Sequence, residues 1–459
     1  MDIIASHSCL SGSIQVPGSK SHTIRALLLA SLAEGKSTIL NPLPSADCKS
    51  TAAAIPLLGA NVNLEEKDRW IVQGAGKNLH LPEDVINVGN SGSLLYFLSP
   101  IAACFEGWSV FTGDKSIRTR PVKHVVDVLN QMGAKAFLTK EDATTCPLII
   151  KGPIHSNTTV YTEGSVSSQY ISGLMMAALL LEGTLNIELS NPKETPYLTM
   201  TQKWLEHVGA KVDISKDFKH ISVAGPVEIK AFDVAVPSDW EAVAFPLIAA
   251  LMTDSKITIE HIDGSSTQGD EAIVSVLQSL GADIEWNKEK ETLTVCGGKK
   301  AKDGLGRLST ENLNNNELHV NLSGYPDAIC ALAVIACFTE GTTYIEDISV
   351  CRKKETDRIK VLKEELSKTG AVLEEGDDYL IIKGHSPITK EGKTNPLFNL
   401  HGATINSYGD HRVAMAAACM GLALPKNEQL KILDAECCAV SFPDFFEAMT
   451  KIGSSFKKV

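Results

Sequence analysis

Residues 207–225 read HVGAKVDISKDFKHISVAG. Apolar positions that stop at Gly209 predict a helix with a glycine C-cap, and the alternating residues that follow predict a β-hairpin closing on Gly225. The same phrase recurs at residues 57–74, 131–152, 279–297 and 368–384. The glycines that end the predicted helices are spaced by 72 to 89 residues and are Gly59, Gly133, Gly209, Gly281 and Gly370. A period this long is typical of a repeat architecture.

A second phrase recurs out of phase with the first. Residues 34–40, EGKSTIL, predict a helix that ends at a glycine and is followed by a strand. Equivalent stretches lie at residues 106–111, 182–188 and 340–346, and MTDSKITIE at 252–260 fills the remaining place. Together the two phrases predict a βαβαββ module of about 75 residues. Five copies are complete or nearly so. A sixth is expected to close from both ends of the chain, with a helix ending near Gly453 and strands within residues 3–16.

The composition is typical of a soluble globular protein. Of 459 residues, 44% are apolar and 21% are charged, and the net charge of −12 argues against non-specific nucleic-acid binding. The longest apolar run, residues 328–338, is too short to cross a membrane, and no secretory signal is visible. Eleven scattered cysteines without a C-x-x-C pair predict reduced thiols in the cytoplasm, and the histidines show no metal-ligand spacing.

Four predicted helix starts carry a cation, although a helix N-terminus already bears partial positive charge. These helices are expected to start near Ser21, at Pro121, near Thr356 and near Asp410, and their cations are Lys20, Arg25, Arg120, Lys354, Arg358 and Arg412. Local rules tend to fail at functional sites. A free helix N-terminus beside a guanidinium is suited to an anion, so several such ends predict a site for a multiply anionic small molecule.

Two further predicted helix starts are rich in small hydrogen-bonding groups. One is the stretch Asn90, Ser91, Gly92 and Ser93, and the other contains Ser165, Ser167, Ser168 and Gln169. Hydroxyls and free amides at a helix start suit phosphate or carboxylate oxygens. Gly35-Lys36-Ser37 looks like the end of a nucleotide-binding P-loop, but position 30 is alanine and a strand follows, which argues against nucleotide hydrolysis.

Nine phrases along the chain carry a resemblance to a known family. They are residues 16–35 (VPGSKSHTIRALLLASLAEG), 89–93 (GNSGS), 118–129 (RTRPVKHVVDVL), 164–170 (GSVSSQY), 266–272 (STQGDEA), 325–336 (YPDAICALAVIA), 352–359 (RKKETDRI), 408–416 (YGDHRVAMA) and 441–449 (SFPDFFEAM). In this order they resemble the 5-enolpyruvylshikimate-3-phosphate (EPSP) synthase family over nearly the whole chain. The repeats alone leave open a solenoid or two globular lobes. The resemblance implies an inside-out α/β fold of two lobes with three βαβαββ repeats each: residues 1–18 with 238–459 as lobe I, and 19–237 as lobe II.

The resemblance also implies the chemistry. The family transfers the enolpyruvyl group of phosphoenolpyruvate to the 5-hydroxyl of shikimate 3-phosphate and releases phosphate, a step of aromatic amino-acid biosynthesis. It uses no metal or organic cofactor. The expected partners are these two anionic substrates, with no nucleic acid and no membrane, and the expected state is a cytoplasmic monomer.

Site roles follow from the same resemblance. The residues expected to hold shikimate 3-phosphate are Lys20, Ser21, Arg25, Ser167, Ser168, Gln169, Thr195, Asp327 and Lys354. Those expected to hold phosphoenolpyruvate are Lys20, Gly92, Arg120, Gln169, Arg358 and Arg412. The expected catalytic residues are Lys20, Asp327, which would orient the attacking hydroxyl and take its proton, and Glu355, which would protonate the methylene carbon. The small Gly92 is the residue type associated with inhibition by glyphosate in this family.

Several positions depart from the family's pattern. Val440 stands where a phosphoenolpyruvate-binding lysine is common, with Lys431 as a possible replacement, and Val350 stands where an asparagine can touch the shikimate ring. Glu194 or Thr195 occupies the place of a phosphate-binding serine. Because a carboxylate at that place would repel phosphate, Thr195 is the better candidate.

Two other functions remain as alternatives. One is the related enolpyruvyl transfer to UDP-N-acetylglucosamine, against which Ser21, Arg25 and the Ser167-Ser168 pair argue. The other is a non-catalytic repeat protein that binds anions, with Val440 marking lost activity.

Overall fold

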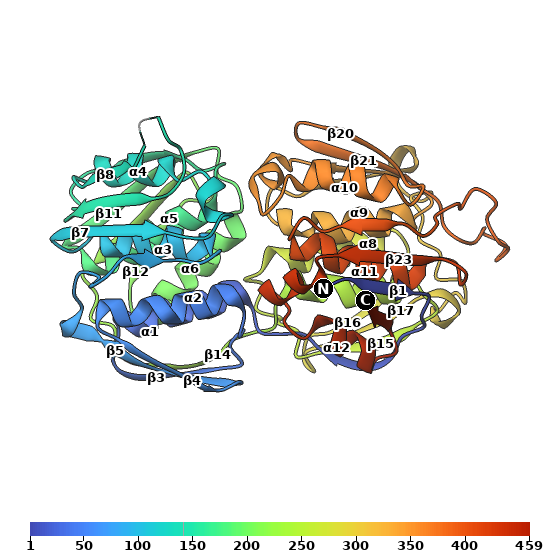
Figure 1. Ribbon diagram of the computed structural model, residues 1–459, viewed down its shortest axis with the longest axis horizontal. Helices are drawn as coiled ribbons and strands as arrows, with labels where there is room; N and C mark the ends of the chain where they lie inside the picture. Colours follow the sequence, from blue (N-terminus) through green and yellow to red (C-terminus); the bar gives the residue numbers. More distant parts are fainter. Residues whose placement is uncertain (141) are drawn as a thin grey trace. The chain divides into compact units, whose positions relative to one another are not determined.

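The computed structural model describes residues 1–140 and 142–459, and its chain divides into two compact units (Figure 1). Unit 1 comprises Met1–Pro17 and Ser238–Val459, and unit 2 comprises Gly18–Pro237. Each unit has its own hydrophobic core. Each also contains three four-stranded sheets, which makes six in the described part of the chain.

Unit 2 holds the first three modules, drawn from blue to green in Figure 1. Its sheets have the strand orders β14-β3-β5-β4, β6-β7-β9-β8 and β10-β11-β13-β12. The strands are β3 (Glu34–Leu40), β4 (Asn61–Glu66), β5 (Arg69–Ala75), β6 (Ile86–Asn87), β7 (Gly107–Thr112), β8 (Lys135–Leu138), β9 (Leu148–Gly152), β10 (Val160–Glu163), β11 (Gly183–Ser190), β12 (Lys211–Ile214), β13 (His220–Gly225) and β14 (Asp233–Ala235). The helices are α1 (Lys20–Leu32), α2 (Ala46–Ala54), α3 (Gly92–Ala102), α4 (Lys123–Gln131), α5 (Ser168–Ala177) and α6 (Thr195–His207).

Unit 1 repeats this arrangement. Its sheets have the strand orders β2-β15-β17-β16, β18-β19-β21-β20 and β22-β23-β1-β24. The strands are β1 (Ile3–Ser6), β2 (Ser11–Gln15), β15 (Lys256–Glu260), β16 (Asp283–Asn287), β17 (Thr292–Cys296), β18 (Glu317–Asn321), β19 (Gly341–Glu346), β20 (Val372–Gly376), β21 (Tyr379–Gly384), β22 (Thr404–Asn406), β23 (Gln429–Leu433) and β24 (Ser455–Lys458). The helices are α7 (Trp240–Leu251), α8 (Ile273–Ser279), α9 (Ile329–Cys337), α10 (Arg358–Ser367), α11 (His411–Ala423) and α12 (Phe445–Lys451).

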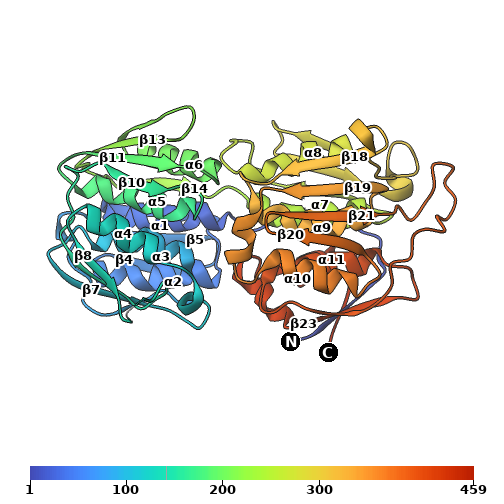
Figure 2. The same cartoon turned by 90° about the horizontal axis from the view of Figure 1, so that it is seen from above.

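All six sheets share one topology. The first strand of a module lies parallel to the second, as β10 does to β11 with Val160 opposite Ile187. The hairpin that ends the module then adds two antiparallel strands. Figure 2 shows this order for β18, β19, β21 and β20. The predicted α/β fold of six βαβαββ repeats is therefore confirmed.

The first strands of the chain correct one part of the prediction. β1 lies between β23 and β24 and completes the sixth module, as expected. β2 instead pairs in parallel with β15 in a different sheet, so residues 3–16 do not all join the sixth module. β14 likewise pairs in parallel with β3 and completes the first sheet of unit 2. The reason is that the chain crosses between units after β2 and again after β14, and each crossing strand supplies the missing first strand of a sheet.

Six helices are buried along nearly their whole length and form the centres of the two cores: α1, α3 and α5 in unit 2, and α7, α9 and α11 in unit 1. Every residue of α9 and of α11 is buried. A helix that is hydrophobic on all sides must be enclosed by other elements. The sheets and the outer helices provide that enclosure. In the described part of the chain no helix has the length and apolar character needed to cross a membrane.

The repeated glycines have two separate physical causes. Those that end the first phrase's helices adopt positive φ, as Gly209 does at +94°, which side chains other than glycine tolerate poorly. Those that end the hairpins press against the end of an inner helix. A Cβ at Gly225 would lie 2.0 Å from the carbonyl oxygen of Ala178, and one at Gly384 would lie 1.9 Å from that of Ala336. The second glycine therefore permits the close approach of strand and helix.

The two causes predict different costs for the same substitution. Gly225→Ala is expected to lower the free energy of unfolding by about 3 kcal/mol or more, because backbone atoms must move apart. Gly209→Ala meets open space and is expected to lower it by only about 1 kcal/mol, from the strained φ. Urea unfolding of both variants measures the difference. Equal losses would contradict the steric explanation.

Candidate active site

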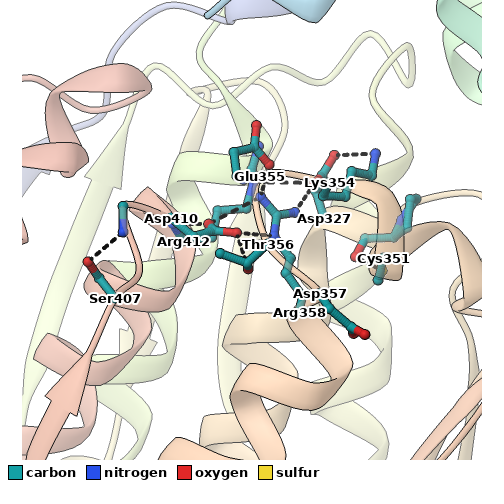
Figure 3. Close-up of polar contacts among 12 residues, drawn as sticks. Asp327, Cys351, Lys354, Glu355, Thr356, Asp357, Arg358, Ser407, Asp410 and Arg412 are labelled. Carbon is teal, nitrogen blue, oxygen red and sulfur yellow. Dashed lines mark hydrogen bonds and ion pairs between the residues drawn. The ribbon is translucent and has the colours of Figure 1, made fainter. Parts of the chain in front are cut away.

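Arg358 is the centre of a buried polar cluster in unit 1 (Figure 3). Asp357 is the N-cap of α10, and its side chain accepts a hydrogen bond from the backbone N–H of Lys360 at 3.1 Å. The helix therefore begins at Arg358, two residues after the predicted start at Thr356. Its guanidinium lies at a helix N-terminus with no exposed surface.

Three carboxylates neutralise this guanidinium. Its Nε donates to Asp410 Oδ2 at 2.8 Å, its Nη2 donates to Glu355 Oε2 at 2.7 Å, and its Nη1 donates to Asp327 Oδ1. Burial acts to lower the pKa of Arg358, but Asp410, Glu355 and Asp327 outweigh it and raise the pKa well above its ordinary value. Arg358 is thus a permanent cation that holds two predicted catalytic carboxylates.

Arg412 lies beside it at the start of α11. This helix was predicted to start near Asp410, and Asp410 is its N-cap and accepts a hydrogen bond from the backbone N–H of Arg412 at 3.0 Å. The Arg412 side chain pairs with Glu241 and has its Nε 3.4 Å from Asp327 Oδ1. Burial opposes its charge, but Glu241 and Asp327 more than compensate and raise its pKa well above the ordinary value.

Asp327 is paired with three cations of the cluster. It lies in the 3₁₀ turn Pro326–Ala328 that leads into α9. Besides Arg358 and Arg412, it faces Lys354, whose Nζ is 3.6 Å from Asp327 Oδ2. All five residues predicted in unit 1 are therefore brought together by the fold: Asp327, Lys354, Glu355, Arg358 and Arg412.

Three carboxylates of this cluster were missed in the sequence. Asp410 is recognisable there only as a helix cap, yet its side chain is fully buried on Arg358. Glu241, in the first turn of α7, is the partner of Arg412. Asp270 is buried close by, and its pKa is raised well above the ordinary value by burial and by the charges of Glu241 and Asp327. No local pattern identifies these residues, because their partners are distant in sequence. Across the described residues, no His, Cys, Asp or Glu group is arranged to hold a metal ion.

In unit 2, Lys20 is the first residue of α1, just after the N-cap Ser19. Its Nζ lies 3.5 Å from Asp47 Oδ2 at the start of α2, and both side chains are largely buried. The cation predicted at this helix start is therefore present, and the neighbouring helix contributes a carboxylate that the sequence did not reveal.

Arg25 lies deeper in the same unit, between α1, α5 and α6, and is 1% exposed. Its Nε donates to Thr201 Oγ1 at 3.0 Å, its Nη1 donates to the Ser21 carbonyl at 3.0 Å, and its guanidinium carbon is 4.8 Å from the centre of the Phe97 ring. Within the described residues its hydrogen-bond partners are all neutral. Burial lowers the pKa of Arg25 to about 9, so it remains charged at neutral pH.

Arg120 does not stand at a helix start as predicted. α4 begins at Lys123 rather than at Pro121, because Pro121 forms a β-bridge with Thr145 and remains extended. Arg120 instead reaches the beginning of α3, where a Cβ at Gly92 would lie 3.0 Å from its Nη1. Gly92 and Arg120 therefore lie together at the start of α3, whereas Arg120 was predicted to lie at the start of the helix after Pro121.

At the start of α5, Ser167 is the N-cap, and its Oγ accepts a hydrogen bond from the Gln169 N–H at 3.2 Å. Gln169 is half-buried, whereas Ser168 is buried. Glu194, not Thr195, lies on Ser168: its Oε2 accepts hydrogen bonds from both the backbone N–H and the Oγ of Ser168 at 3.0 Å. Thr195 is the half-buried first residue of α6, and its role stays a prediction.

The remaining departures from the family pattern are placed in turns. Val440 ends the 3₁₀ helix Ala435–Val440 and is half-buried, and Val350 is buried in the 3₁₀ helix Ser349–Lys353. Lys431 pairs with Asp2 at 3.0 Å on the sheet of the sixth module. That side chain is thus paired on the sheet, and its replacement of the missing lysine stays a prediction.

Comparison with solved structures defines the class of the fold. The chain superposes over its full length on EPSP synthase from Acinetobacter baumannii, with a TM-score of 0.79 at 24% identity and 100% coverage of both chains. It also resembles the enolpyruvyl transferase NikO from Streptomyces tendae, with a TM-score of 0.75 at 16% identity, covering 99% of this chain and 98% of that one. The fold is that of the enolpyruvyl transferases.

Sequence comparison gives the family. The family model for EPSP synthase (3-phosphoshikimate 1-carboxyvinyltransferase) matches residues 4–449. The 3-phosphoshikimate 1-carboxyvinyltransferase of Methanocaldococcus jannaschii is 37% identical over 453 residues, covering 98% of this chain and 97% of that protein. That of Acetivibrio thermocellus is 35% identical over 445 residues, with 97% and 96% covered. The chain belongs to the EPSP synthase family, and its activity is enolpyruvyl transfer from phosphoenolpyruvate to shikimate 3-phosphate.

The buried ion pair between Arg358 and Asp410 is expected to contribute to the free energy of unfolding. Asp410→Asn leaves a buried guanidinium with one fewer counterion, and we expect the free energy of unfolding to fall by about 3 kcal/mol. Asp357→Asn is the matched control, because Asp357 caps the same helix but pairs with the partly exposed Arg352. We expect less than about 1 kcal/mol there. Denaturant unfolding measures both, and equal losses would contradict a special role for Asp410.

Proposed function

We propose that the clustered cations hold the anionic groups of the two substrates and that Asp327 and Glu355 move the protons of the reaction. One observation supports this proposal most strongly: two carboxylates from separate segments of unit 1 share the buried guanidinium of Arg358. An acid and a base held on one rigid cation are positioned without depending on solvent-exposed side chains.

Arg358 and Arg412 are assigned to phosphoenolpyruvate. Both are buried, both are permanently charged, and both lie at helix starts whose N–H groups add to the positive potential. Guanidinium groups pair with phosphate and carboxylate through two parallel hydrogen bonds. Lys20, Gly92, Arg120 and Gln169 are assigned to the same substrate from unit 2. Gly92 leaves space beside Arg120 that a side chain would fill.

Shikimate 3-phosphate is assigned to the remaining predicted residues. Ser167 and Ser168 present a helix start with hydroxyl and amide donors to its phosphate. Arg25, Ser21 and Lys354 are assigned to this substrate as well, together with Gln169, Thr195 and Asp327. The hydrogen-bond partners of Arg25 among the described residues are neutral, which supports its assignment, since a bound anion supplies a counterion.

The proton transfers follow from the two carboxyl groups. Glu355 in its acid form protonates the methylene carbon of phosphoenolpyruvate, which makes C2 cationic. The 5-hydroxyl oxygen attacks C2, and its proton, now strongly acidic, passes to Asp327. The carbon–oxygen bond to phosphate then breaks, and the departing phosphate takes up the proton held by Asp327. The methyl group returns a proton to the Glu355 carboxylate, which restores the vinyl group. Arginines beside the departing phosphate stabilise its developing charge.

The finer physical properties are also proposals. We assign the protein as a monomer in the cytoplasm, and its eleven free cysteines are consistent with that location.

One assay separates the assigned function from the two alternatives, which are transfer to UDP-N-acetylglucosamine and a non-catalytic anion-binding protein. Purified protein mixed with phosphoenolpyruvate is expected to release phosphate with shikimate 3-phosphate and not with the UDP-sugar.

Glu355→Gln tests the assignment of the acid. We expect kcat for phosphate release to fall by about 10² to 10⁴, because the amide cannot protonate carbon. Incorporation of solvent deuterium into the methylene group of phosphoenolpyruvate, in the presence of shikimate 3-phosphate, is expected to fall in parallel. Glu375→Gln is the control, since Glu375 pairs with Arg352 in the same unit. Undiminished deuterium incorporation by Glu355→Gln would assign the acid to another group.

Gly92→Ala tests the contact at the start of α3. The new Cβ lies 3.0 Å from Arg120 Nη1 and is expected to displace that guanidinium. We expect the KM for phosphoenolpyruvate to rise about tenfold and competitive inhibition by glyphosate to weaken. Gly264→Ala, where a Cβ meets open space, is the control. An unchanged KM would show that Arg120 does not depend on the small residue.

A further inference from the structure

Glu194 is a buried carboxylate that occupies the first donors of α5. It is 4% exposed, and its Oε2 accepts hydrogen bonds from the backbone N–H and the Oγ of Ser168, both at 3.0 Å. Ser168 is the first residue of a ten-residue helix, so this N–H is one of the groups that an anion at the helix start would bind.

The backbone of Glu194 directs its side chain to this place. Glu194 is the N-cap of α6 and adopts φ +51° and ψ +34°, a left-handed conformation that residues other than glycine rarely adopt. Its carbonyl accepts a hydrogen bond from the Tyr197 N–H at 3.0 Å, as in the first turn of a helix. One residue therefore stands at the starts of two neighbouring helices: its carboxylate lies on the first residue of α5, and its carbonyl accepts the first-turn hydrogen bond of α6. The partial positive charge of the α5 N-terminus favours an anion there.

Arg25 is a buried cation of α1 that contacts both of these helices. Arg25 donates to Ser172 of α5 at 3.4 Å and to the Tyr197 carbonyl of α6 at 3.4 Å, so it joins the same pair of helices. Its hydrogen-bond partners among the described residues are neutral oxygens. The carboxylate of Glu194 thus lies at the start of α5, and the charge of Arg25 is available to a bound anion.

We propose that Glu194 is an internal anion that holds the donors of Ser168 in the free enzyme, and that the phosphate of shikimate 3-phosphate displaces it on binding. This inference rests on the proposed function, which assigns Ser167 and Ser168 to that phosphate. Two anions cannot accept from the same N–H and hydroxyl at 3.0 Å, and their mutual repulsion is large where water is excluded.

The consequence is selectivity. A free phosphate or sulfate ion must displace Glu194 with only the contacts of the phosphate group. Shikimate 3-phosphate has additional contacts from its ring hydroxyls, so it retains enough binding free energy after displacement. Glu194 therefore acts as a specificity-determining residue that excludes inorganic phosphate, a product of the reaction, from the shikimate 3-phosphate subsite.

Two variants separate charge from shape. Glu194→Gln keeps the size of the side chain and an oxygen acceptor but removes the charge, and Glu194→Ser removes the group that reaches Ser168. We expect both to lower the KM for shikimate 3-phosphate by about tenfold and to leave the KM for phosphoenolpyruvate within twofold. We also expect inorganic phosphate to compete with shikimate 3-phosphate at concentrations at least tenfold lower than in the wild type. Glu206→Gln, an exposed glutamate at the far end of α6, is the control.

Binding of inorganic phosphate measured by calorimetry, without any turnover, tests the displacement by itself. Tighter phosphate binding by Glu194→Gln than by the wild type supports the inference even if turnover is absent, in which case the proposed function alone fails. An unchanged or raised KM for shikimate 3-phosphate, together with unchanged phosphate binding, in a Glu194→Gln protein with the wild-type unfolding midpoint would overturn the inference. Glu194 would then hold the two helix starts together and not compete with substrate.

Discussion

The constraint on which the rest of this structure depends is the complete burial of its inner helices. α9 and α11 have no exposed face, and α3 has none either. A helix enclosed along its whole length can offer a ligand only its ends. Backbone N–H groups at those N-termini need acceptors, and their partial charge attracts anions. The N-termini of these helices are therefore the places where the fold leaves polar groups available, and their sides serve mainly packing.

The two units satisfy this constraint with opposite charge arrangements. In unit 1, Arg358 and Arg412 are matched by carboxylates of the same cluster, so the positive helix starts are already balanced and the carboxylates are held in fixed positions. In unit 2, Arg25 has neutral partners, and the carboxylate of Glu194 lies on a helix start instead. One unit thus pairs its buried arginines with carboxylates, and the other keeps Arg25 among neutral hydrogen-bond partners in the described part of the chain.

The sequence predicts the modules well because their glycines are required by the backbone itself. Positive φ at Gly209 and the close approach at Gly225 leave a signal in each repeat. The start of α4 was misplaced because Pro121 bridges to Thr145, a pairing that helix-capping rules do not include. Asp410, Glu241 and Glu194 were not recognised as parts of the site, or not correctly placed in it. Their roles depend on partners such as Arg358 and Ser168 that lie 52 and 26 residues away.

The division of unit 1 between the two ends of the chain sets the order in which the chain can fold as it is synthesised. Unit 2 is a continuous stretch, Gly18–Pro237, and contains every strand of its three sheets. It can be completed as soon as β14 has left the ribosome. β2 must wait for Lys256–Glu260, and β1 pairs with residues more than 420 positions later. The strands in the first seventeen residues therefore have no partner strand until all of unit 2 has been synthesised. Because their pairing is so distant in sequence, we expect unit 1 to fold more slowly than unit 2.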